Sequence, residues 1–286
     1  MAKTGTKRKP KRKSTTGRRN GVLTARRADR YDLYLKSVQV PEYEVTFFNR
    51  VYRQAFGRPP RVLREDFCGT AAVCCEWVRN KPGRAAIGVD LDPEPVEWGK
   101  RHNVAKLKPA DQQRIVFIRD DVRRVRGPKA DVIAAENFSY FIFKTRPELL
   151  GYFKAARRNL AKQGVFVLDL MGGPEVMEEQ LEDKRRQDGF TYIWEQARFD
   201  PISHDCSFYI HFHFKDGSRL RRAFEYHWRL WTIPEVSELL REAGFRQVDV
   251  YWEDTDAETG EGNDVFRRRK TASTEPTYII YIVAIK

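Results

Sequence analysis

The sequence predicts an α/β fold with a mainly parallel sheet, because short apolar segments and helical segments alternate along most of the chain. The strand-like segments are RVLREDF, RAAIGVD, RIVFIRD, ADVIAAEN and VFVLDLM. Two more, QVDVYW and TYIIYIVAI, follow near the C-terminus with no helical pattern between them. Parallel neighbours need a crossover of a dozen or more residues, usually a helix, so we expect an antiparallel last pair. The intervening loop, 253–275, is long enough to leave parallel pairing open.

The helical segments carry recognisable ends. PEYEVTFFNRVYRQAFG has apolar residues at helical spacing, with Pro41 in its first turn and Gly57 at its end. Asp92 is placed to cap the helix of PEPVEWGKRHNVAKL. The segment RPELLGYFKAARRNLAKQG predicts a long helix that ends at Gly164, and TIPEVSELLREAGF opens with a capping-box arrangement at Thr232.

Residues 189–230 depart from this alternation and predict antiparallel strands. In SFYIHFHF the aromatic and aliphatic residues alternate with tyrosine and histidine, and KDGS is a hairpin signal. We therefore expect three parts. They are a disordered basic tail over 1–28, an N-terminal helical lid over 29–60, and an α/β domain over 61–286 with an antiparallel insertion at 185–230.

The net charge of +13 is concentrated at the N-terminus. Residues 1–30 hold twelve Lys and Arg against one acid, which leaves only +2 for the rest of the chain. A nearly neutral body argues against nucleic-acid binding over the whole surface. The tail itself is suited to nonspecific nucleic-acid contact, and equally to a solubility or tethering role.

Composition excludes several other classes of protein. No apolar run approaches the ~20 residues that span a bilayer, so we expect no membrane partner. The N-terminus lacks the apolar region of a secretory signal, and residues 3–20 hold no large apolar residue for an amphipathic presequence. Four cysteines without CxxC spacing indicate reduced thiols, and the expected location is cytoplasmic.

Acidic residues stand at the ends of three successive predicted strands. Glu65 and Asp66 end the first, Asp90 ends the second, and Asp120 and Asp121 end the third. Ligands of open α/β sheets bind outside the carboxyl ends of the strands, and an acid after the second strand suits the two hydroxyls of a ribose. Three acids in register therefore predict a nucleoside-containing ligand, with the third acid near an adenine amino group.

The motifs LREDFCGTA, GVDLDPEP and NFSY, in this order, resemble those of class I S-adenosylmethionine (SAM)-dependent methyltransferases, from about residue 31 to the C-terminus. Together with SVQ and GEGN, they look like a bacterial subgroup whose substrate the resemblance does not name. The resemblance implies a Rossmann-like seven-stranded, mainly parallel sheet with an antiparallel last strand, plus an antiparallel β hairpin inserted after strand 5. It also implies SAM as the cofactor.

The family's first motif is usually an acid followed by Gly-x-Gly-x-Gly. Here Glu65 matches the acid and Gly69 the second glycine, while Phe67 and Ala71 replace the first and third. The cofactor-binding residues that the resemblance implies are Tyr31, Tyr34, Glu65, Phe67, Cys68, Gly69, Thr70, Asp90, Leu91, Asp121, Val122, Asn137 and Ser139. The bulky Phe67 side chain, where the loop usually has none, predicts an altered backbone path.

Candidates for catalytic groups are Glu136, Tyr140, His211 and His213. The two histidines share one strand face, a geometry that can bind a metal, but no third ligand is visible and no metal is expected. A catalytic thiol would need an activating histidine nearby, so the cysteines of FCGTAAVCC are predicted to be packing residues.

The sequence thus predicts methyl transfer from SAM to an unidentified acceptor, which is a small molecule or a group on RNA or protein. The alternative is a nucleic-acid- or ribosome-associated binding protein on a methyltransferase-like scaffold, suggested by the tail and the altered glycine motif. A nicotinamide dehydrogenase is disfavoured, because GxGxxG is missing and Asp121 stands in the adenine position.

Overall fold

The computed structural model describes residues 23–256, 258 and 262–286. The chain divides into two compact units. The larger unit contains residues 41–170, 231–272 and 280–286, and the smaller unit contains the described residues up to 40 together with 171–230 and 273–279. The first 22 residues of the expected tail lie outside the described part, so its proposed nucleic-acid contact remains a prediction.

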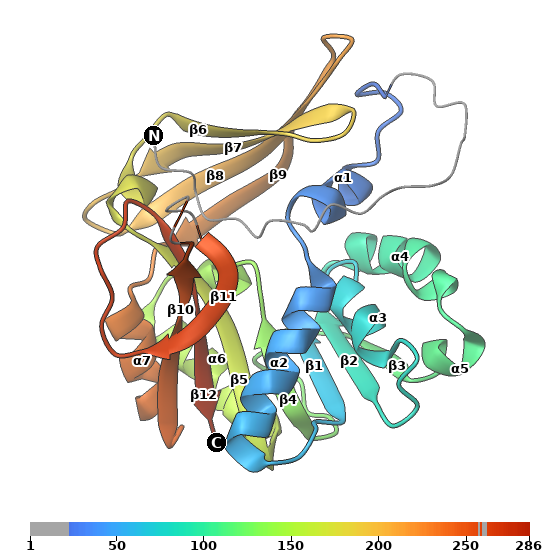
Figure 1. Cartoon of the computed structure of the whole chain (residues 1–286), viewed down its shortest axis with the longest axis vertical. Helices are drawn as coiled ribbons and strands as arrows, with labels where there is room; N and C mark the ends of the chain where they lie inside the picture. Colours follow the sequence, from blue (N-terminus) through green and yellow to red (C-terminus); the bar gives the residue numbers. More distant parts are fainter. Residues whose placement is uncertain (1–22, 257, 259–261) are drawn as a thin grey trace. The chain divides into compact units, whose positions relative to one another are not determined.

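The larger unit is built on an eight-stranded sheet in the order β11-β10-β12-β5-β4-β1-β2-β3 (Figure 1). Its elements, including the parts of β5 and β12 that extend past the unit's boundary, are α2 (Pro41–Phe56), β1 (Val62–Asp66), α3 (Ala72–Val78), β2 (Ala85–Asp90), α4 (Pro93–His102), η1 (Val104–Lys106), α5 (Pro109–Gln112), β3 (Ile115–Arg119), β4 (Ala130–Ala135), η2 (Ser139–Ile142), α6 (Arg146–Asn159), β5 (Leu160–Gly172), α7 (Ile233–Glu242), β10 (Gln247–Thr255), β11 (Gly262–Arg269) and β12 (Tyr278–Ile285).

The strand directions confirm the predicted mainly parallel sheet with an antiparallel end. Strands β1 to β5 pair in parallel, whereas β10 pairs antiparallel with β12. At the far end of β12, the Lys286 N–H donates to the Gly164 carbonyl near the start of β5 at 3.0 Å, so β12 also runs against β5. The two C-terminal strands therefore pair antiparallel, as we predicted from the lack of a crossover helix between them.

One strand more is present than the seven expected. Residues 262–269 were expected within a loop but form β11, which pairs antiparallel with β10. This segment is highly charged, and its pattern therefore predicted no strand. The structure supplies two reasons for pairing: Phe266 is buried, and Arg267 and Arg269 each form an ion pair with Asp254 of β10.

Apolar layers cover the sheet on both faces. Val165 and Val167 of β5 join the core cluster that includes residues of α2 and α3. Phe166 points to the other face, where its ring lies 5.9 Å from those of Phe153 on α6 and Phe245 after α7. This alternation explains why the central strands carry apolar residues on both faces, since both sides are buried.

Helix ends mostly follow the sequence signals. The Asp92 carboxylate accepts the Glu94 N–H at 2.9 Å, and Thr232 forms a complete capping box. Helix α6, however, ends at Asn159 and not at Gly164 as predicted. Leu160 is already extended and pairs with Ala130 of β4, so tertiary pairing overrides the helical pattern of the next four residues.

The smaller unit is built on a four-stranded antiparallel sheet in the order β6-β7-β8-β9. Its elements are α1 (Arg30–Ser37), η3 (Pro174–Met177), β6 (Leu181–Arg186), β7 (Phe190–Phe199), β8 (Asp205–Phe214) and β9 (Arg219–Arg229). The expected antiparallel insertion is thus a sheet of four strands. It begins at Leu181, four residues earlier than predicted. The charged segment LEDKRR of β6 has no apolar alternation that would predict a strand.

The described N-terminal residues belong to this smaller unit. Leu23, Ala25 and Ala28 pack against its apolar cluster, and the Ala25 N–H donates to the Ser218 hydroxyl at 2.9 Å. Residues 23–28, expected as part of the tail, therefore contact the sheet. Among the residues that the structure describes, no helix is long and apolar enough to cross a membrane.

Candidate functional site

The sheet order places a topological switch point between β1 and β4. From β1 the chain moves outward to β2 and β3, then returns to the other side of β1 for β4 and β5. Open α/β sheets bind ligands in the crevice at such a point, outside the carboxyl ends of the strands. The loop after β1 (residues 67–71, here the β1–α3 loop) and the turn after β4 (residues 136–140, here the β4 turn) flank this position.

The β1–α3 loop has an unusual backbone. Phe67, Gly69 and Ala71 all have positive φ, at 58°, 47° and 55°. These are the three positions that the family motif fills with glycine. Left-handed backbone costs non-glycine residues roughly 1–2 kcal/mol each. The loop thus places Phe67 and Ala71, which replace the first and third glycines, at positions where glycine would carry no strain. That Phe67 alters the path of the backbone stays a prediction.

Contacts from neighbouring strands and helices hold this loop. The Cys68 N–H donates to the Val89 carbonyl of β2 at 3.0 Å, and the Gly69 N–H donates to Asp90 Oδ2 at 2.8 Å. Helix α4 packs so closely that a Cβ on Gly99 would lie 2.2 Å from the Thr70 carbonyl oxygen. Asp90 therefore connects the ends of β1 and β2 by fixing the loop's central amide.

The Phe67 side chain packs on the larger unit's aromatic residues. Its ring lies 6.1 Å from that of Phe143 and 5.7 Å, edge to face, from that of Tyr152 on α6. Such pairs contribute roughly 0.5–1.5 kcal/mol beyond burial, which offsets part of the backbone cost. The residue that replaces the first glycine is thus held by packing.

Glu65 is buried beneath the loop, and its Oε2 accepts the Cys74 N–H in the first turn of α3 at 2.9 Å. Burial raises the pKa of Glu65 to about 8, against the hydrogen bond from Cys74, and the nearby negative charge of Glu44 adds to this rise. Glu65 therefore supports the start of α3 from inside the protein.

Asp66, the next residue, points to a different set of partners. Its carboxylate pairs with Arg64 at 2.6 Å and accepts the Tyr152 hydroxyl at 3.0 Å, in a fully buried site. Burial raises the pKa of Asp66, and the Arg64 guanidinium opposes this. Asp66, and not Glu65, thus forms the ion pair with Arg64.

Asp90 accepts two backbone hydrogen bonds and borders open space. Its Oδ1 accepts the Asp92 N–H at 2.9 Å, while Oδ2 holds Gly69. Burial raises its pKa, and the backbone hydrogen bonds partly oppose the rise. Leu91 beside it is 58% exposed, and a Cβ on Gly69 would meet no atom within 4 Å. Open space and exposed apolar surface therefore adjoin a carboxylate at the end of β2.

Asp121 is engaged by a residue that the sequence did not single out. Arg123 reaches back to it, with Nη2 2.7 Å from Oδ2 and the backbone N–H donating to Oδ1 at 2.8 Å. This hydrogen bonding lowers the pKa of Asp121. Val122 between them is buried, and its carbonyl accepts Arg64 Nη2 at 3.1 Å. Asp121 is therefore ionised and already paired.

The β4 turn has its own strained backbone. Asn137 and Phe138 have φ of 58° and 57°, and their N–H groups donate to the two oxygens of Asp169 at 2.7 and 2.8 Å. The Ser139 hydroxyl donates to the Glu136 carbonyl at 2.8 Å. Asp169, in the middle of β5, thus fixes the turn with both carboxylate oxygens.

Two of the proposed catalytic residues also lie in this turn. Glu136 is 6% exposed at the end of β4. Tyr140 is fully buried, its hydroxyl donates to the Asp169 carbonyl at 3.0 Å, and burial raises its pKa well above 10. The Tyr140 hydroxyl is therefore committed to the fold.

The remaining proposed residues belong to the smaller unit. Tyr31 and Tyr34 of α1 pack on Phe224, with ring centroids 5.9 and 4.8 Å away. His211 is buried, with Nε2 2.7 Å from Glu195 Oε2 and Nδ1 accepting the Arg222 N–H at 3.0 Å, so both ring nitrogens are engaged.

His213 is half-buried on the same strand. Burial lowers its pKa, and the positive charge of Arg219 adds to this. These histidines and tyrosines lie in a different compact unit from the β1–α3 loop, and their role toward a cofactor or substrate remains a prediction.

The cysteines behave as packing residues. All four are free thiols and buried. Burial raises the pKa of Cys68 and Cys74 well above 9 and that of Cys75 to about 12, so a reactive thiolate is disfavoured. The described residues contain no group of three or more His, Cys, Asp or Glu side chains able to hold a metal ion.

Sequence reasoning missed three residues that shape this site. Glu44 lies in the buried stripe of α2, and Asp169 lies inside the apolar strand segment VFVLDLM. An acid within an apolar pattern is a signal in the sequence, because charged residues are rarely buried without a partner. Arg123 gave no such signal, because arginine is common in the basic segment that follows β3.

No protein-family model matches this sequence, and no curated protein matches it either. Solved structures do match. CalS10, an amino pentose methyltransferase from Micromonospora echinaspora solved with SAM bound, has a TM-score of 0.63 at 16% identity, covering 94% of this chain and 99% of its own. KedS8, a sugar N-methyltransferase from Streptoalloteichus, has a TM-score of 0.60 at 18% identity, covering 96% and 98%.

A SAM-dependent methyltransferase from Clostridium acetobutylicum has a TM-score of 0.61 at 18% identity, covering 89% of this chain and 96% of its own. The chain has the fold of SAM-dependent methyltransferases. Identities this low establish the methyltransferase fold alone. The predicted fold class is therefore confirmed, with β11 as an addition.

Proposed function

We propose that the protein is a SAM-dependent methyltransferase. The observation that carries this proposal is the β1–α3 loop, whose three left-handed positions start at the end of β1 and whose central amide is held by Asp90. Left-handed backbone at non-glycine residues is concentrated at functional sites, and this loop has it at two positions.

The residues present fit SAM. Asp90 and the exposed Leu91 would hold the ribose and contact the adenine, and the open space at Gly69 allows a ligand to approach the backbone. Val122 and Asp121 would border the adenine. Asp121 is paired with Arg123. Its carboxylate would therefore have to accept hydrogen bonds from both Arg123 and the adenine amino group.

When bound, SAM supplies a methyl group on a sulfonium, which is already activated for transfer. The protein's own residues then have to orient the acceptor and exclude water. Glu136, at the carboxyl end of β4, is the candidate to accept a proton from the acceptor, since Tyr140 is committed to Asp169.

The acceptor is the open part of this proposal. CalS10 is described as an amino pentose methyltransferase and KedS8 as a sugar N-methyltransferase, so amines on small molecules are the first class to test. RNA and protein groups remain candidates. The alternative of a binding protein on this scaffold gains no support from the structural neighbours.

The decisive test is calorimetric titration of SAM and of its demethylated product into the full chain, followed by transfer of tritiated methyl from SAM into fractionated lysate. We expect saturable, micromolar SAM binding and label in one fraction. A well-folded protein that gives no SAM heat would contradict the proposal. SAM binding without label in any fraction would support the scaffold alternative.

A further inference from the structure

Asp121 lies at the same edge of the sheet as Asp90 and Leu91. In the register of β2 and β3, Asp90 pairs with Arg119, so Asp121 stands two residues beyond that pair along the chain. The Asp121 side chain is 13% exposed, which leaves it within reach of a ligand. The partners of Asp121 therefore bear on what the proposed SAM site accepts.

Arg123 takes up most of the hydrogen-bonding capacity of Asp121. Its Nη2 donates to Oδ2 at 2.7 Å, its backbone N–H donates to Oδ1 at 2.8 Å, and its Nε lies 3.1 Å from both oxygens. An ionised carboxylate offers about four acceptor sites. These three donors therefore leave the carboxylate with about one site for a further donor.

The Arg123 side chain is itself held by packing. The guanidinium carbon lies 5.0 Å from the centroid of the Phe143 ring, a distance at which a cation and a ring attract each other. Phe143 in turn packs on Tyr152 of α6 and on Phe67 of the β1–α3 loop, with ring centroids 5.2 and 6.1 Å away. The bulky residue that replaces the first glycine thus supports the ring beside Arg123.

The backbone of residues 121–123 is held as well. The Val122 carbonyl accepts Arg64 Nη2 at 3.1 Å, and the Arg123 carbonyl accepts Arg158 Nη2 at 3.3 Å. Arg64 is buried and forms an ion pair with Asp66, so this contact comes from inside the protein. The protein's own contacts therefore set the position of the Asp121 carboxylate.

The neighbouring pair of Asp120 and Arg124 gives a contrast. Arg124 Nη2 lies 3.3 Å from Asp120 Oδ1, and the Arg124 side chain is 73% exposed. An exposed ion pair of this kind contributes little to stability. The same basic segment thus holds one surface pair and one pair with several hydrogen bonds, and the second contains the acid assigned to the SAM site.

We propose that Arg123 is a positioning residue that makes the SAM site selective for a purine with an amino group. It fixes an ionised Asp121 with one acceptor site left, which suits the N–H of an amino group and repels a keto oxygen. Hydrogen bonding from Arg123 also lowers the pKa of Asp121, so the carboxyl group does not gain the proton that it would need to donate to a keto oxygen. The inference rests on the proposed function, in which the SAM adenine borders Asp121.

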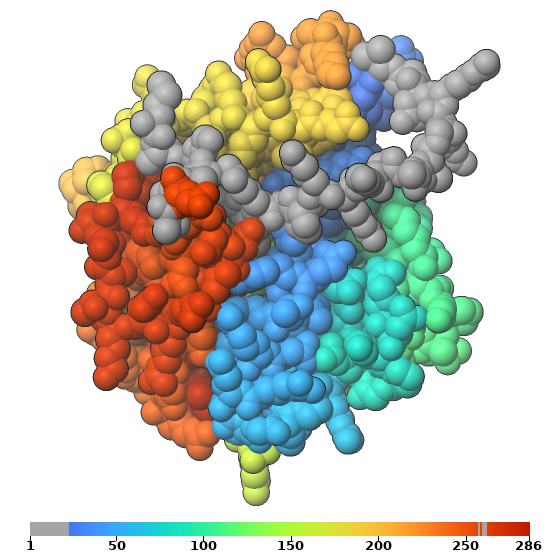
Figure 2. Space-filling view, in the orientation of Figure 1, coloured from blue at the N-terminus to red at the C-terminus, as the bar shows by residue number. Residues whose placement is uncertain are grey.

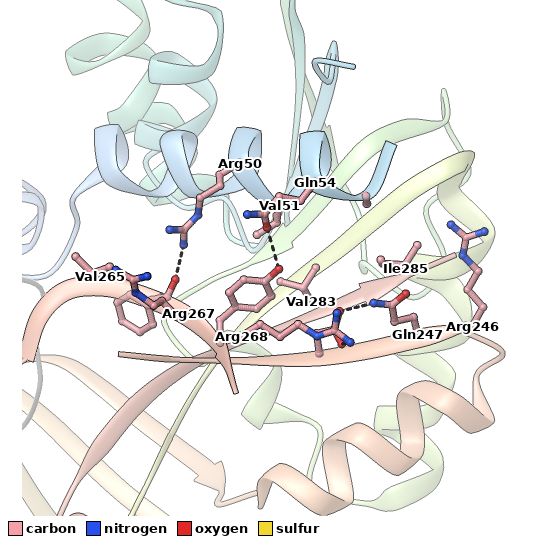
Figure 3. A pocket seen from close by; sticks show the side chains of 14 residues that line it. Arg50, Val51, Gln54, Arg246, Gln247, Val265, Arg267, Arg268, Val283 and Ile285 are labelled. Carbon is pink, nitrogen blue, oxygen red and sulfur yellow. Dashed lines mark hydrogen bonds and ion pairs between the residues drawn. The ribbon is translucent and has the colours of Figure 1, made fainter. Parts of the chain in front are cut away.

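A cavity of about 750 Å³ elsewhere in the larger unit is separate from this position. It lies between α2 and the strands β10, β11 and β12 (Figure 3), and Figure 2 shows the surfaces of α2 and of the β10–β11 region as neighbours. In the sheet order, β5, β4, β1 and β2 stand between these strands and β3. Neither Arg123 nor any of the proposed SAM contacts lines the cavity, so a variant at Arg123 leaves its lining unchanged.

The test compares S-adenosylhomocysteine with S-inosylhomocysteine, which carries a keto oxygen in place of the amino group, in calorimetric titrations of the full chain. The decisive variant is Arg123→Gln, because the Arg123 side chain is 39% exposed and can be replaced without opening the core. Arg124→Gln is the matched control, since Arg124 is the next residue and pairs with an acid outside the proposed site. The measured quantity is the ratio of the two affinities, because a merely structural loss would weaken both ligands alike.

We expect wild type and Arg124→Gln to bind the adenosine compound roughly tenfold to a hundredfold more tightly than the inosine compound, as for one hydrogen bond to a charged group. In Arg123→Gln the carboxylate is free to turn away, so the ratio should fall by about fivefold, as for the loss of one pre-ordered side chain. Arg123→Lys keeps the charge but lacks the planar fork, and it should lose part of the ratio.

Equal ratios in wild type and Arg123→Gln would overturn the proposal. So would a larger ratio in Arg123→Gln, which would mean that Arg123 competes with the amino group. If circular dichroism shows Arg123→Gln to be unfolded, an unchanged ratio in Arg123→Lys would overturn the proposal instead. Wild type that binds both compounds equally would overturn this inference alone, whereas wild type that binds neither would contradict the proposed function as well.

Discussion

The β1–α3 loop and the β4 turn share an unusual backbone conformation. Each follows a central strand and places two non-glycine residues in the left-handed region, Phe67 and Ala71 in one and Asn137 and Phe138 in the other. In each, a carboxylate from the adjacent strand accepts backbone hydrogen bonds, from Gly69 between the two residues of the loop and from both residues of the turn. Asp90 does this for the loop, and Asp169 for the turn.

The two carboxylates differ in their exposure to solvent. Asp169 is 2% exposed and uses both oxygens on the turn. Asp90 is half-buried and borders the exposed Leu91 and the open space at Gly69. We therefore expect an acid that holds a loop at this edge of the sheet to be an internal support when it is buried, and a ligand contact when it borders open space. The following experiments test that difference.

The largest effect is expected for Asp90→Ala on SAM affinity. The change removes both the proposed ribose contacts and the hydrogen bond that holds the Gly69 N–H. Hydrogen bonds to charged groups contribute roughly 1.5–3 kcal/mol each, so we expect a loss of about a hundredfold or more, measured by calorimetry. Asp92→Ala is the control, because it removes only the cap of α4 and should lower stability by about 1 kcal/mol with little effect on SAM. Equal SAM affinity in wild type and Asp90→Ala would remove the basis for this site.

Asp169→Ala should act on stability. It leaves the N–H groups of Asn137 and Phe138 without their acceptors in a partly buried turn, at a cost of up to about 1–3 kcal/mol each. Asp169→Asn keeps one acceptor oxygen and should lose about half as much. Urea unfolding measures both, with the exposed Glu238→Ala as control. If Asp169→Ala matched the control, the carboxylate would not be holding the turn.

The third expectation concerns pH. Unfolded Glu65 loses its proton near 4.5, whereas the folded group keeps it to about pH 8 because it is buried. Across this window unfolding releases a proton, so rising pH favours the unfolded state and lowers stability. Urea unfolding at pH 5 to 8 should show this decline in wild type, and Glu65→Gln should flatten it. Glu76→Gln, on the helix α3 whose first turn Glu65 supports, should lose stability with rising pH as wild type does. A decline of equal slope in Glu65→Gln would mean that Glu65 is ionised in the folded protein.

The smallest effect is expected for Phe67→Gly compared with Phe67→Ala. Both remove the ring contacts with Phe143 and Tyr152, but only alanine retains the left-handed strain. We therefore expect the glycine variant to be at least as stable as the alanine variant in urea unfolding. At an ordinary negative φ, alanine would be the more stable of the two by roughly 0.5–1 kcal/mol, so that order of stability would contradict the left-handed backbone.

The sequence predicted the central architecture well, because local signals and global fold agree there. The apolar strands, the Asp92 and Thr232 caps and the antiparallel last pair all follow from pattern and loop length. Strands β6 and β11 were not predictable in this way. Their residues are charged, and they become strands because a neighbouring strand supplies hydrogen bonds. Strand β11 also gains opposite charge from Asp254 of β10.

For the candidate site, the sequence by itself determined which residues stand after β1, β2 and β3, because strand ends can be read from the change of apolar pattern. Only the tertiary structure decided what each does. Packing buries Glu65 under α3, pairs Asp66 with Arg64 and Asp121 with Arg123, and leaves Asp90 beside open space. The physical reason is that the role of a carboxylate depends on its exposure and partners, and these come from residues distant in sequence.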